Sequence, residues 1–330
     1  MKRRILIILL ATITLGINAC GINRNTDETA SNDIMVADDT KLSGDTKVSD
    51  DTKVSDDTEA SDDTEALDDT DVSEVEEAKP IINQEGITLE ERIAVPEGYK
   101  RTEEDAGSLA AFMRGYKLKP AGSQVLLYDG TQKGNQSAHA AVFELPIEEY
   151  DLQQCADSVM RVYAEYYWST GQYDKIAFHF TNGFDAQYSK WREGYRIKVD
   201  GNNVYWSKTA GYDDSYESFV QYLKMVFMYA GTLSMESEAE QIQLSDIRVG
   251  DVFLYGASPG HVVMIVDVCE DESGKKAFLL GQGYMPAQEF HVLKNNMHED
   301  DPWYYEDEIE YPFSTPEYTF KEGSLKRLQY

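Results

Sequence analysis

Apolar positions between residues 250 and 268 form two runs, separated by a short connection of Gly, Ala, Ser and Pro. This pattern predicts a strand, a short loop and a second strand. His261 stands where the second strand begins, directly after Gly260. An imidazole fixed at the mouth of a hairpin can act as a general base near neutral pH. The alternative is a structural histidine whose ring nitrogens are satisfied by hydrogen bonds.

A third apolar run, residues 277–284, is expected to return antiparallel to the His261 strand. Gln282 lies near the end of this run, at about the depth of His261 across the strand pair. A side-chain amide there can orient the imidazole through its second nitrogen. Residues 285–294 then turn into another strand, which carries His291.

A helical pattern lies upstream of the hairpin. Residues 152, 159, 163 and 166 are apolar, which predicts a helix over residues 151–168. Asp151 is the expected N-cap and places Cys155 in the first turn or just beyond it. The free amides and the dipole at a helix start favour thiolate over thiol, so a cysteine there is a better nucleophile. The alternative is that Cys155 belongs to the buried stripe, since free cysteine is often a core residue.

Other patterns fill the remainder of the folded region. A helix is expected at about residues 216–229, with one apolar face. Residues 125–128 and 138–145 predict strands around an Asp-Gly turn, and His139 enters the second of them. The tail, residues 301–330, combines three prolines with aromatic residues and predicts loops and short strands.

The first 20 residues have the pattern of an export signal. Basic residues precede an apolar run that ends at Leu15, and Ala19 stands directly before Cys20. This apolar core is too short to span a bilayer comfortably as a permanent helix. Residues 1–19 resemble a bacterial lipoprotein signal peptide, which implies cleavage before Cys20 and acyl chains such as palmitate on its sulfur. Ordinary secretion is the alternative. Acylation would hold a domain at a membrane surface outside the cytoplasm.

Residues 20–80 predict a disordered, acidic tether. A six-residue unit repeats there, as in residues 50–55 (DDTKVS) and 56–61 (DDTEAS), and large apolar residues are scarce. Such a repeat cannot bury enough surface to offset chain entropy. It also lacks the glycine-turn spacing of calcium loops. Much of the formal net charge of −30 lies in this segment, and the acidity argues against nucleic acid as a partner.

Residues 81–330 have the composition of a single folded domain, rich in Tyr, Phe, Trp and aliphatic residues. If Cys20 carries lipid, Cys155 and Cys269 remain, and an oxidising compartment would permit a disulfide between them. Cys269 lies roughly 25 Å along its strand from His261 at the usual strand rise. The disulfide and an approach of Cys155 to His261 therefore exclude each other.

The order of a helix-start cysteine, a Gly-Asp strand, a Gly-His strand and a polar residue on the next strand resembles the papain-like bacterial hydrolases of the NlpC and CHAP type. The resemblance covers residues 151–168 and 250–294. It implies an α+β fold with insertions, in which the helix packs on a small antiparallel β-sheet. It also implies that Cys155 is the nucleophile, His261 the base and Gln282 the orienting residue. The residues before the cysteine and the long cysteine-to-histidine spacing depart from the pattern of those families.

The folded region also resembles a family of uncharacterised bacterial lipoproteins. The residues that carry this resemblance are 135–140 (NQSAHA) and 284–288 (YMPAQ). A family without an established activity implies localisation and leaves the function open.

These patterns together predict a membrane-tethered, extracytoplasmic cysteine amidohydrolase or endopeptidase acting on cell-wall peptides. The alternative is a non-catalytic lipoprotein that binds glycan or peptide of the cell envelope on the same scaffold. The expected partners are the membrane, through the lipid anchor, and such a peptide or glycan. We expect no metal and no cofactor. The candidate substrate-binding residues, of which the first two are also explained as scaffold, are Trp191, Arg192, Tyr284, His139 and His291.

Overall fold

Strand β9 (His261–Asp271) is the centre of a nine-stranded antiparallel sheet. The structure, a computed structural model, describes residues 80–330; the predicted signal peptide, Cys20 and nearly all of the acidic tether lie outside this range. The other strands of the sheet are β1 (Tyr99–Arg101), β2 (His139–Val142), β7 (Ala239–Gln241), β8 (Val252–Tyr255), β10 (Lys276–Gln282), β11 (His291–Leu293), β12 (Tyr304–Tyr305) and β15 (Leu325–Leu328). Their order is β2-β11-β10-β9-β8-β15-β7, while β1 pairs with β9 and β12 with β10.

Helices accompany this sheet, so the α+β class predicted from the sequence is confirmed. The papain-like arrangement stays a prediction. Within the described residues the α-helices are α1 (Leu89–Arg92), α2 (Leu109–Arg114), α3 (Cys155–Ser169), α4 (Tyr188–Arg192), α5 (Tyr216–Phe227) and α6 (Thr232–Ser237). The short 3-10 helices are η1 (Tyr173–Lys175), η2 (Leu244–Asp246) and η3 (Glu306–Glu308).

The predicted hairpin is present as β8 and β9. Tyr255 pairs with His261 where the two strands meet the loop. Strand β10 returns antiparallel to β9 as expected and ends at Gln282. A register shift between Leu279 and Leu280 interrupts this pairing. Nearly all residues of β9 and β10 are buried, because both strands lie inside the sheet and pack against other elements.

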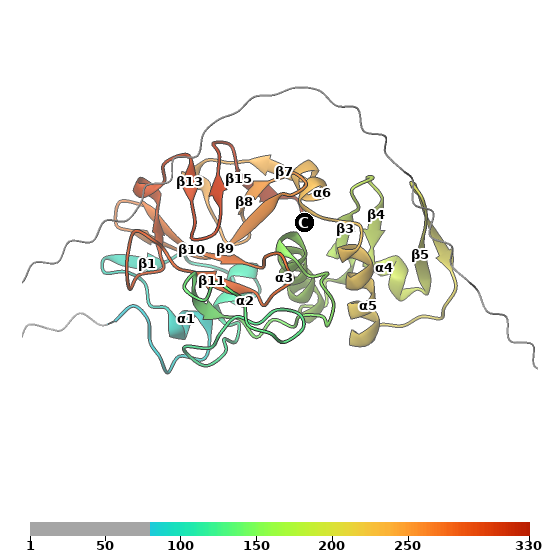
Figure 1. Cartoon of the computed structure of the whole chain (residues 1–330), viewed down its shortest axis with the longest axis horizontal. Helices are drawn as coiled ribbons and strands as arrows, with labels where there is room; N and C mark the ends of the chain where they lie inside the picture. Colours follow the sequence, from blue (N-terminus) through green and yellow to red (C-terminus); the bar gives the residue numbers. More distant parts are fainter. Residues whose placement is uncertain (1–79) are drawn as a thin grey trace, which may run out of the picture. The chain divides into compact units, whose positions relative to one another are not determined.

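Helix α3 is buried on almost all sides. It packs against β9 and β10, and in Figure 1 the segment that contains α4 and α5 lies on its other side. There Trp168 stacks on Phe219 with ring centroids 5.7 Å apart, and Arg161 Nη2 donates to the Tyr216 hydroxyl at 2.9 Å. A helix that is covered all round needs apolar residues beyond a single stripe, which explains its run of Val, Met, Ala and Tyr.

The segment after α3 adds two small two-stranded sheets, and the tail adds a third. The strands are β3 (Ala177–His179), β4 (Asp185–Gln187), β5 (Tyr195–Asp200), β6 (Asn203–Lys208), β13 (Phe313–Ser314) and β14 (Thr319–Phe320). The tail therefore consists of loops and short strands, as predicted. It contributes to the core, because Phe313 packs on Phe253 of β8 with ring centroids 4.5 Å apart.

One predicted strand is not formed. Residues 125–128 form no strand and take part only in isolated bridges such as Leu126 with Gln132. Their backbone groups bond within a turn instead, where the Lys133 amide donates to the Val125 carbonyl at 3.0 Å. Residues 285–294 turn into a strand that carries His291, as predicted, and this strand is β11.

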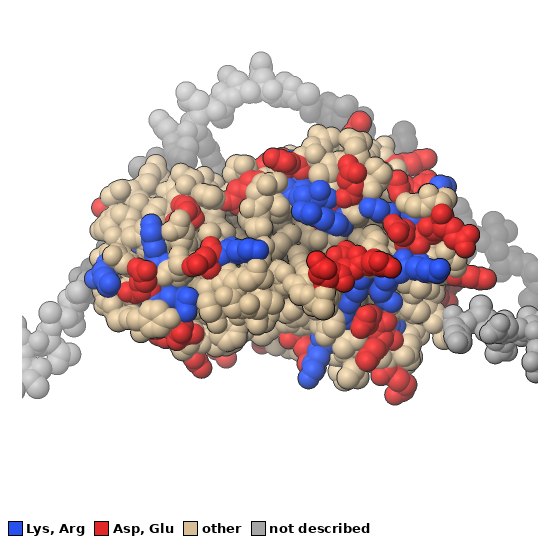
Figure 2. All heavy atoms as spheres, turned by 180° about the vertical axis from the view of Figure 1, so that it is seen from behind, with Lys and Arg blue, Asp and Glu red and all other residues tan. Residues whose placement is uncertain are grey.

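The surface of the described region is polar and mixed in charge. Figure 2 shows acidic and basic side chains interspersed on one face. Exposed ion pairs such as Lys275 with Asp307, 2.8 Å apart, are part of this surface. Within residues 80–330, no helix combines the length and the apolarity that a membrane span requires.

One buried ion-pair group joins β9 to its neighbours. Asp267 has a fully buried side chain on β9 and accepts from Arg101 of β1 and Arg114 of α2, each at 2.7 Å. The side chain of Arg114 is 9% exposed and that of Arg101 20%. Two cations therefore depend on one carboxylate that water does not reach.

We expect Asp267→Ala to lower the free energy of unfolding by about 3–5 kcal/mol, because it leaves two largely buried guanidinium groups without their partner. Urea denaturation of the full chain measures this loss. Glu270→Ala, at the exposed end of the same strand, is the matched control and should change stability by about 0.5 kcal/mol or less. Equal effects of the two substitutions would contradict the assigned role of the ion-pair group.

Candidate functional site

Helix α3 begins at Cys155, with Gln154 as its N-cap. The backbone N–H of Gln154 donates to Asp157 Oδ2 at 3.1 Å. This is the bond in a capping box that runs from the N-cap backbone to the side chain three residues later. The prediction that Asp151 caps the helix is wrong. Asp151 Oδ1 instead accepts from the amide of Ala287 at 2.7 Å, so it ties the chain before α3 to the segment that follows β10.

A glycine allows the end of β10 to approach the first turn of α3. A Cβ atom at Gly283 would lie 2.2 Å from Ser158 Oγ and 3.0 Å from the Gln154 carbonyl oxygen. No side chain fits there without moving the helix or the strand. Gly283 therefore brings Gln282, its neighbour in the chain, close to the helix start that carries Cys155.

Cys155 is 8% exposed. Burial is the larger and the nearby Asp157 the smaller of two causes that raise the pKa of its thiol to about 11. Hydrogen bonds from the backbone N–H groups of Ala156 and Val262 act in the opposite direction. The sulfur is therefore a protonated thiol at neutral pH. Because Val262 directly follows His261, its proximity to the sulfur places Cys155 at the beginning of β9.

The His261 ring is enclosed by aromatic side chains and bonded to Gln282. His261 Nε2 and Gln282 Oε1 are 3.0 Å apart. The rings of Tyr284 and Tyr318 each lie 4.7 Å from the imidazole, centroid to centroid. Burial lowers the pKa of His261 to about 4, against the opposing effect of the Gln282 hydrogen bond and with a smaller contribution from Lys133. The ring is therefore neutral at neutral pH.

The structure thus brings Cys155, His261 and Gln282 into one region. The two tyrosines beside the imidazole are also close to the sulfur, because Cys155 contributes, after burial, to the raised pKa of both. Within residues 80–330, the His261 ring has a hydrogen bond to Gln282 and none to the Cys155 sulfur. Its Nδ1 atom makes no hydrogen bond to any described residue.

The disulfide that the sequence left open is absent from the structure. Cys155 and Cys269 are both free and both buried. Cys269 pairs with Ala277 of β10 and with Arg101 of β1, far along β9 from His261. The approach of Cys155 to the His261 end of this strand explains why the two sulfurs do not meet.

A cleft of about 400 Å³ opens at the start of α3. Asp151 and Asp157 are its acidic lining residues, and no Lys or Arg of the described region lines it. Burial raises the pKa of the Asp157 carboxyl to about 8, so this group is largely protonated at neutral pH. Met228, Leu233 and Met285 line the cleft with about half of their surface exposed. The other lining residues are Leu152, Gln154, Cys155, Ala156, Thr181, Phe227, Ala230, Gly231, Thr232, Ala257, Ser258, Pro259 and Gly260. Among the described residues, no three His, Cys, Asp or Glu side chains come together as a metal site requires.

Two of the predicted substrate-binding residues pack away from this cleft. Trp191 is 7% exposed, and its Nε1 donates to Ser218 Oγ at 3.2 Å. The guanidinium of Arg192 stacks on Tyr173, 4.1 Å from the ring centroid, and donates to the Tyr212 hydroxyl at 2.7 Å. Their contacts are those of a scaffold, which was the alternative considered for both.

The other three candidates are divided between the site and its surroundings. Tyr284 contacts the His261 ring, as described above. His291 is fully buried on the far side of Gln282 from His261. His139 is half-buried at a separate hollow, where its Nε2 lies 3.0 Å from the Ser123 carbonyl oxygen.

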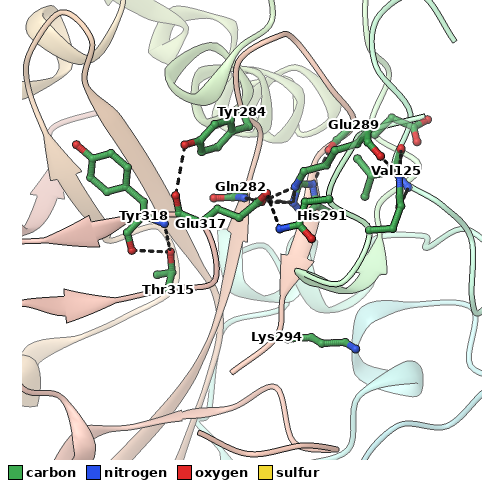
Figure 3. Close-up of polar contacts among 12 residues, drawn as sticks. Val125, Gln282, Tyr284, Glu289, His291, Lys294, Thr315, Glu317 and Tyr318 are labelled. Carbon is green, nitrogen blue, oxygen red and sulfur yellow. Dashed lines mark hydrogen bonds and ion pairs between the residues drawn. The ribbon is translucent and has the colours of Figure 1, made fainter. Parts of the chain in front are cut away.

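Sequence reasoning missed a polar group behind Gln282. Figure 3 shows Gln282 between Glu317 and His291. Gln282 Nε2 donates to Glu317 Oε2 at 2.7 Å, and Lys133 bonds to the same oxygen. Glu317 lies in the tail and Lys133 in a turn, and no local pattern distinguishes either from an ordinary surface charge. Their burial in the folded chain is the only signal, and it requires the tertiary structure.

Comparison with known proteins identifies the family. Residues 89–327, well over half of the chain, match the family model described as a domain of unknown function, DUF4846. No curated protein and no solved structure matches the chain. The expectation of a family without an established activity agrees with this result. The chain therefore belongs to the DUF4846 family.

Proposed function

We propose that this protein is a cysteine amidohydrolase or endopeptidase, tethered to a membrane outside the cytoplasm, that cleaves amide bonds in cell-wall peptides. One observation carries the proposal. The His261 ring is bonded to Gln282 at 3.0 Å at the same strand start where Cys155, the first residue of α3, borders a cleft. A nucleophile, a base and a group that orients the base are the parts that such a hydrolase needs.

In the proposed reaction, the Cys155 sulfur attacks the carbonyl carbon of the scissile amide as its proton passes to His261 Nδ1. The amides at the start of α3 face the oxygen that gains negative charge. Collapse of the tetrahedral intermediate breaks the C–N bond, and the leaving amine takes the proton from His261. Water then attacks the thioester, giving its proton to the same ring, and the acid product and the free thiol are released.

The pKa values at the site favour a neutral resting pair. Burial disfavours an isolated thiolate at Cys155 and an isolated imidazolium at His261. Transfer of one proton from thiol to ring creates both charges side by side, where each stabilises the other. We therefore propose that His261 acts as a general base during attack, with thiol and neutral imidazole as the resting state.

The lining of the cleft suggests a peptide as the substrate. The acidic residues of the lining are Asp151 and the largely protonated Asp157, and the described lining has no cationic side chain. This composition favours neutral or amine-bearing segments over anionic polymers. Its large, exposed apolar residues are Met and Leu, and flexible methionine side chains are common on surfaces that bind varied peptides. Localisation at the cell envelope is proposed from the lipoprotein-like signal before Cys20, which lies outside the described residues.

A non-catalytic, peptide-binding lipoprotein is the second candidate, and the raised thiol pKa is the observation that favours it. A thiol with a pKa of about 11 and no general base is almost unreactive at neutral pH. The chemistry of Cys155 towards an electrophile separates the two candidates.

We expect iodoacetamide to alkylate Cys155 at a rate that is nearly independent of pH between about 5 and 9. In this range, between the pKa of His261 near 4 and that of Cys155 near 11, the pair holds one transferable proton. In His261→Ala the rate at pH 7 should fall about 100-fold and then rise about tenfold per pH unit, as for a lone thiol. Peptide mapping by mass spectrometry measures the rate at each cysteine.

Cys269 is the internal control for this experiment, because it is fully buried and should remain unmodified in the native protein. A wild-type rate that rises tenfold per pH unit and does not depend on His261 would favour the non-catalytic candidate.

We also expect the full chain to release fragments from isolated cell-wall peptides, detected by mass spectrometry. Cys155→Ala should lower this activity by about 1,000-fold or more, because it removes the nucleophile. Cys269→Ala is the matched control and should retain activity, since Cys269 lies at the other end of β9. Fragment release by Cys155→Ala at the wild-type rate would exclude the proposed mechanism.

A further inference from the structure

The Gln282 side chain is fully buried, and both ends of its amide are engaged. Its Nε2 atom faces Glu317 Oε2 at 2.7 Å and His291 Nε2 at 3.3 Å, and its Oε1 atom faces His261 Nε2 at 3.0 Å. A carboxylate oxygen only accepts hydrogen bonds, so the end that faces Glu317 must be the NH₂ group. The end that faces His261 is then the carbonyl, which accepts a hydrogen from the ring.

His291 fixes the second hydrogen of this NH₂ group. Its Nδ1 lies 2.8 Å from the backbone carbonyl oxygen of Glu289, so Nδ1 carries the hydrogen. The other nitrogen, Nε2, is then an acceptor for Gln282 and for the Lys133 ammonium, which is also 3.3 Å away. Burial lowers the pKa of His291 well below its usual value, which keeps the ring neutral and able to accept.

Glu317 and Lys133 are charged groups inside this network. The exposed fraction is 10% for the Glu317 side chain and 7% for that of Lys133, and the two form an ion pair. Asn135 Nδ2 also donates to Glu317 Oε1 at 3.2 Å. The Glu317 carboxylate is therefore held in place from two sides. It also neutralises the Lys133 ammonium, which would otherwise attract the oxygen of the Gln282 amide.

We propose that Glu317, paired with Lys133, is a positioning residue that fixes the orientation of the Gln282 amide and so places the hydrogen of the His261 ring on Nε2. Nδ1 of His261 then has a free electron pair, which is the form that a base requires. The assignment of hydrogens does not depend on catalysis, but its use in the transfer of a proton from Cys155 rests on the proposed function.

Without Glu317, only the 3.3 Å contact with His291 would hold the NH₂ group of Gln282 in its native direction. The Lys133 ammonium, which also contacts His291 Nε2, would have lost its ion-pair partner and would attract the carbonyl oxygen of the amide. The amide would turn, its NH₂ group would face His261, and the ring would carry its hydrogen on Nδ1 instead. The hydrogen bond to a charged acceptor favours the native orientation by about tenfold or more. A tail residue 35 positions after Gln282 thus selects the tautomer of the base.

Side-chain ¹⁵N NMR of the full chain at pH 7 tests this inference directly. The protein contains five histidines, and the signals of His261 are those lost in His261→Ala. In the wild type, Nε2 of His261 should show the shift of a protonated ring nitrogen and Nδ1 that of an unprotonated one. Protonation of Nδ1 in the wild type would overturn the inference without any further variant.

Glu317→Ala should shift the tautomer ratio of His261 by about tenfold or more towards Nδ1–H. The rate of Cys155 alkylation at pH 7 should fall in parallel. Adding Gln282→Glu to this variant should restore the Nε2–H form, because a carboxylate at this position only accepts. Glu322→Ala, at an exposed position of the same tail, is the matched control and should change neither readout.

The outcomes also separate this inference from the proposed function. If Glu317→Ala folds and leaves the tautomer unchanged while the protein hydrolyses peptides, the positioning role is wrong and the function stands. If the tautomer responds as expected but no hydrolysis occurs, the positioning role stands and the function is wrong. A loss of the tautomer preference that Gln282→Glu does not restore would assign Glu317 to folding alone and overturn the inference.

Discussion

The hydrogen bond between His261 Nε2 and Gln282 Oε1 is the interaction on which the proposed chemistry depends. It forms because β9 begins and the antiparallel β10 ends on the same side of the sheet. One strand therefore supplies the ring and the next supplies the amide. It sets the direction in which the other ring nitrogen points. The aromatic rings around the imidazole exclude water from this bond, which strengthens it and also makes it costly to charge the ring.

Close packing between helix α3 and the sheet supplies the second requirement. Gly283 permits the contact with the first turn of the helix, and Asp151 ties the chain before the helix to the segment after β10. The same packing buries the thiol and raises its pKa to about 11. A site built in this way holds its groups in place as neutral species, and proton transfer is favourable only where the two charges form together.

The sequence was sufficient to predict the parts of the site that are made by regular periodicity. The apolar runs around His261 and Gln282 predicted β8, β9 and β10, and the helical spacing predicted α3. The start of α3 was placed too early, because Asp151 looks like a cap but bonds to Ala287 in the folded chain. Lys133 and Glu317 were out of reach altogether. They come from segments without periodicity, and only the tertiary fold brings them behind Gln282.

The most direct measurement of the central claim is a crystal structure of the protein after reaction with a peptide aldehyde. The account predicts a covalent bond from the aldehyde carbon to Cys155 Sγ, with the peptide in the cleft and the new oxygen facing the amides at the start of α3. His261 Nδ1 should lie within hydrogen-bonding distance of the adduct, and Nε2 should still bond to Gln282. An unmodified Cys155, or an adduct whose atoms lie beyond the reach of His261, would contradict the account.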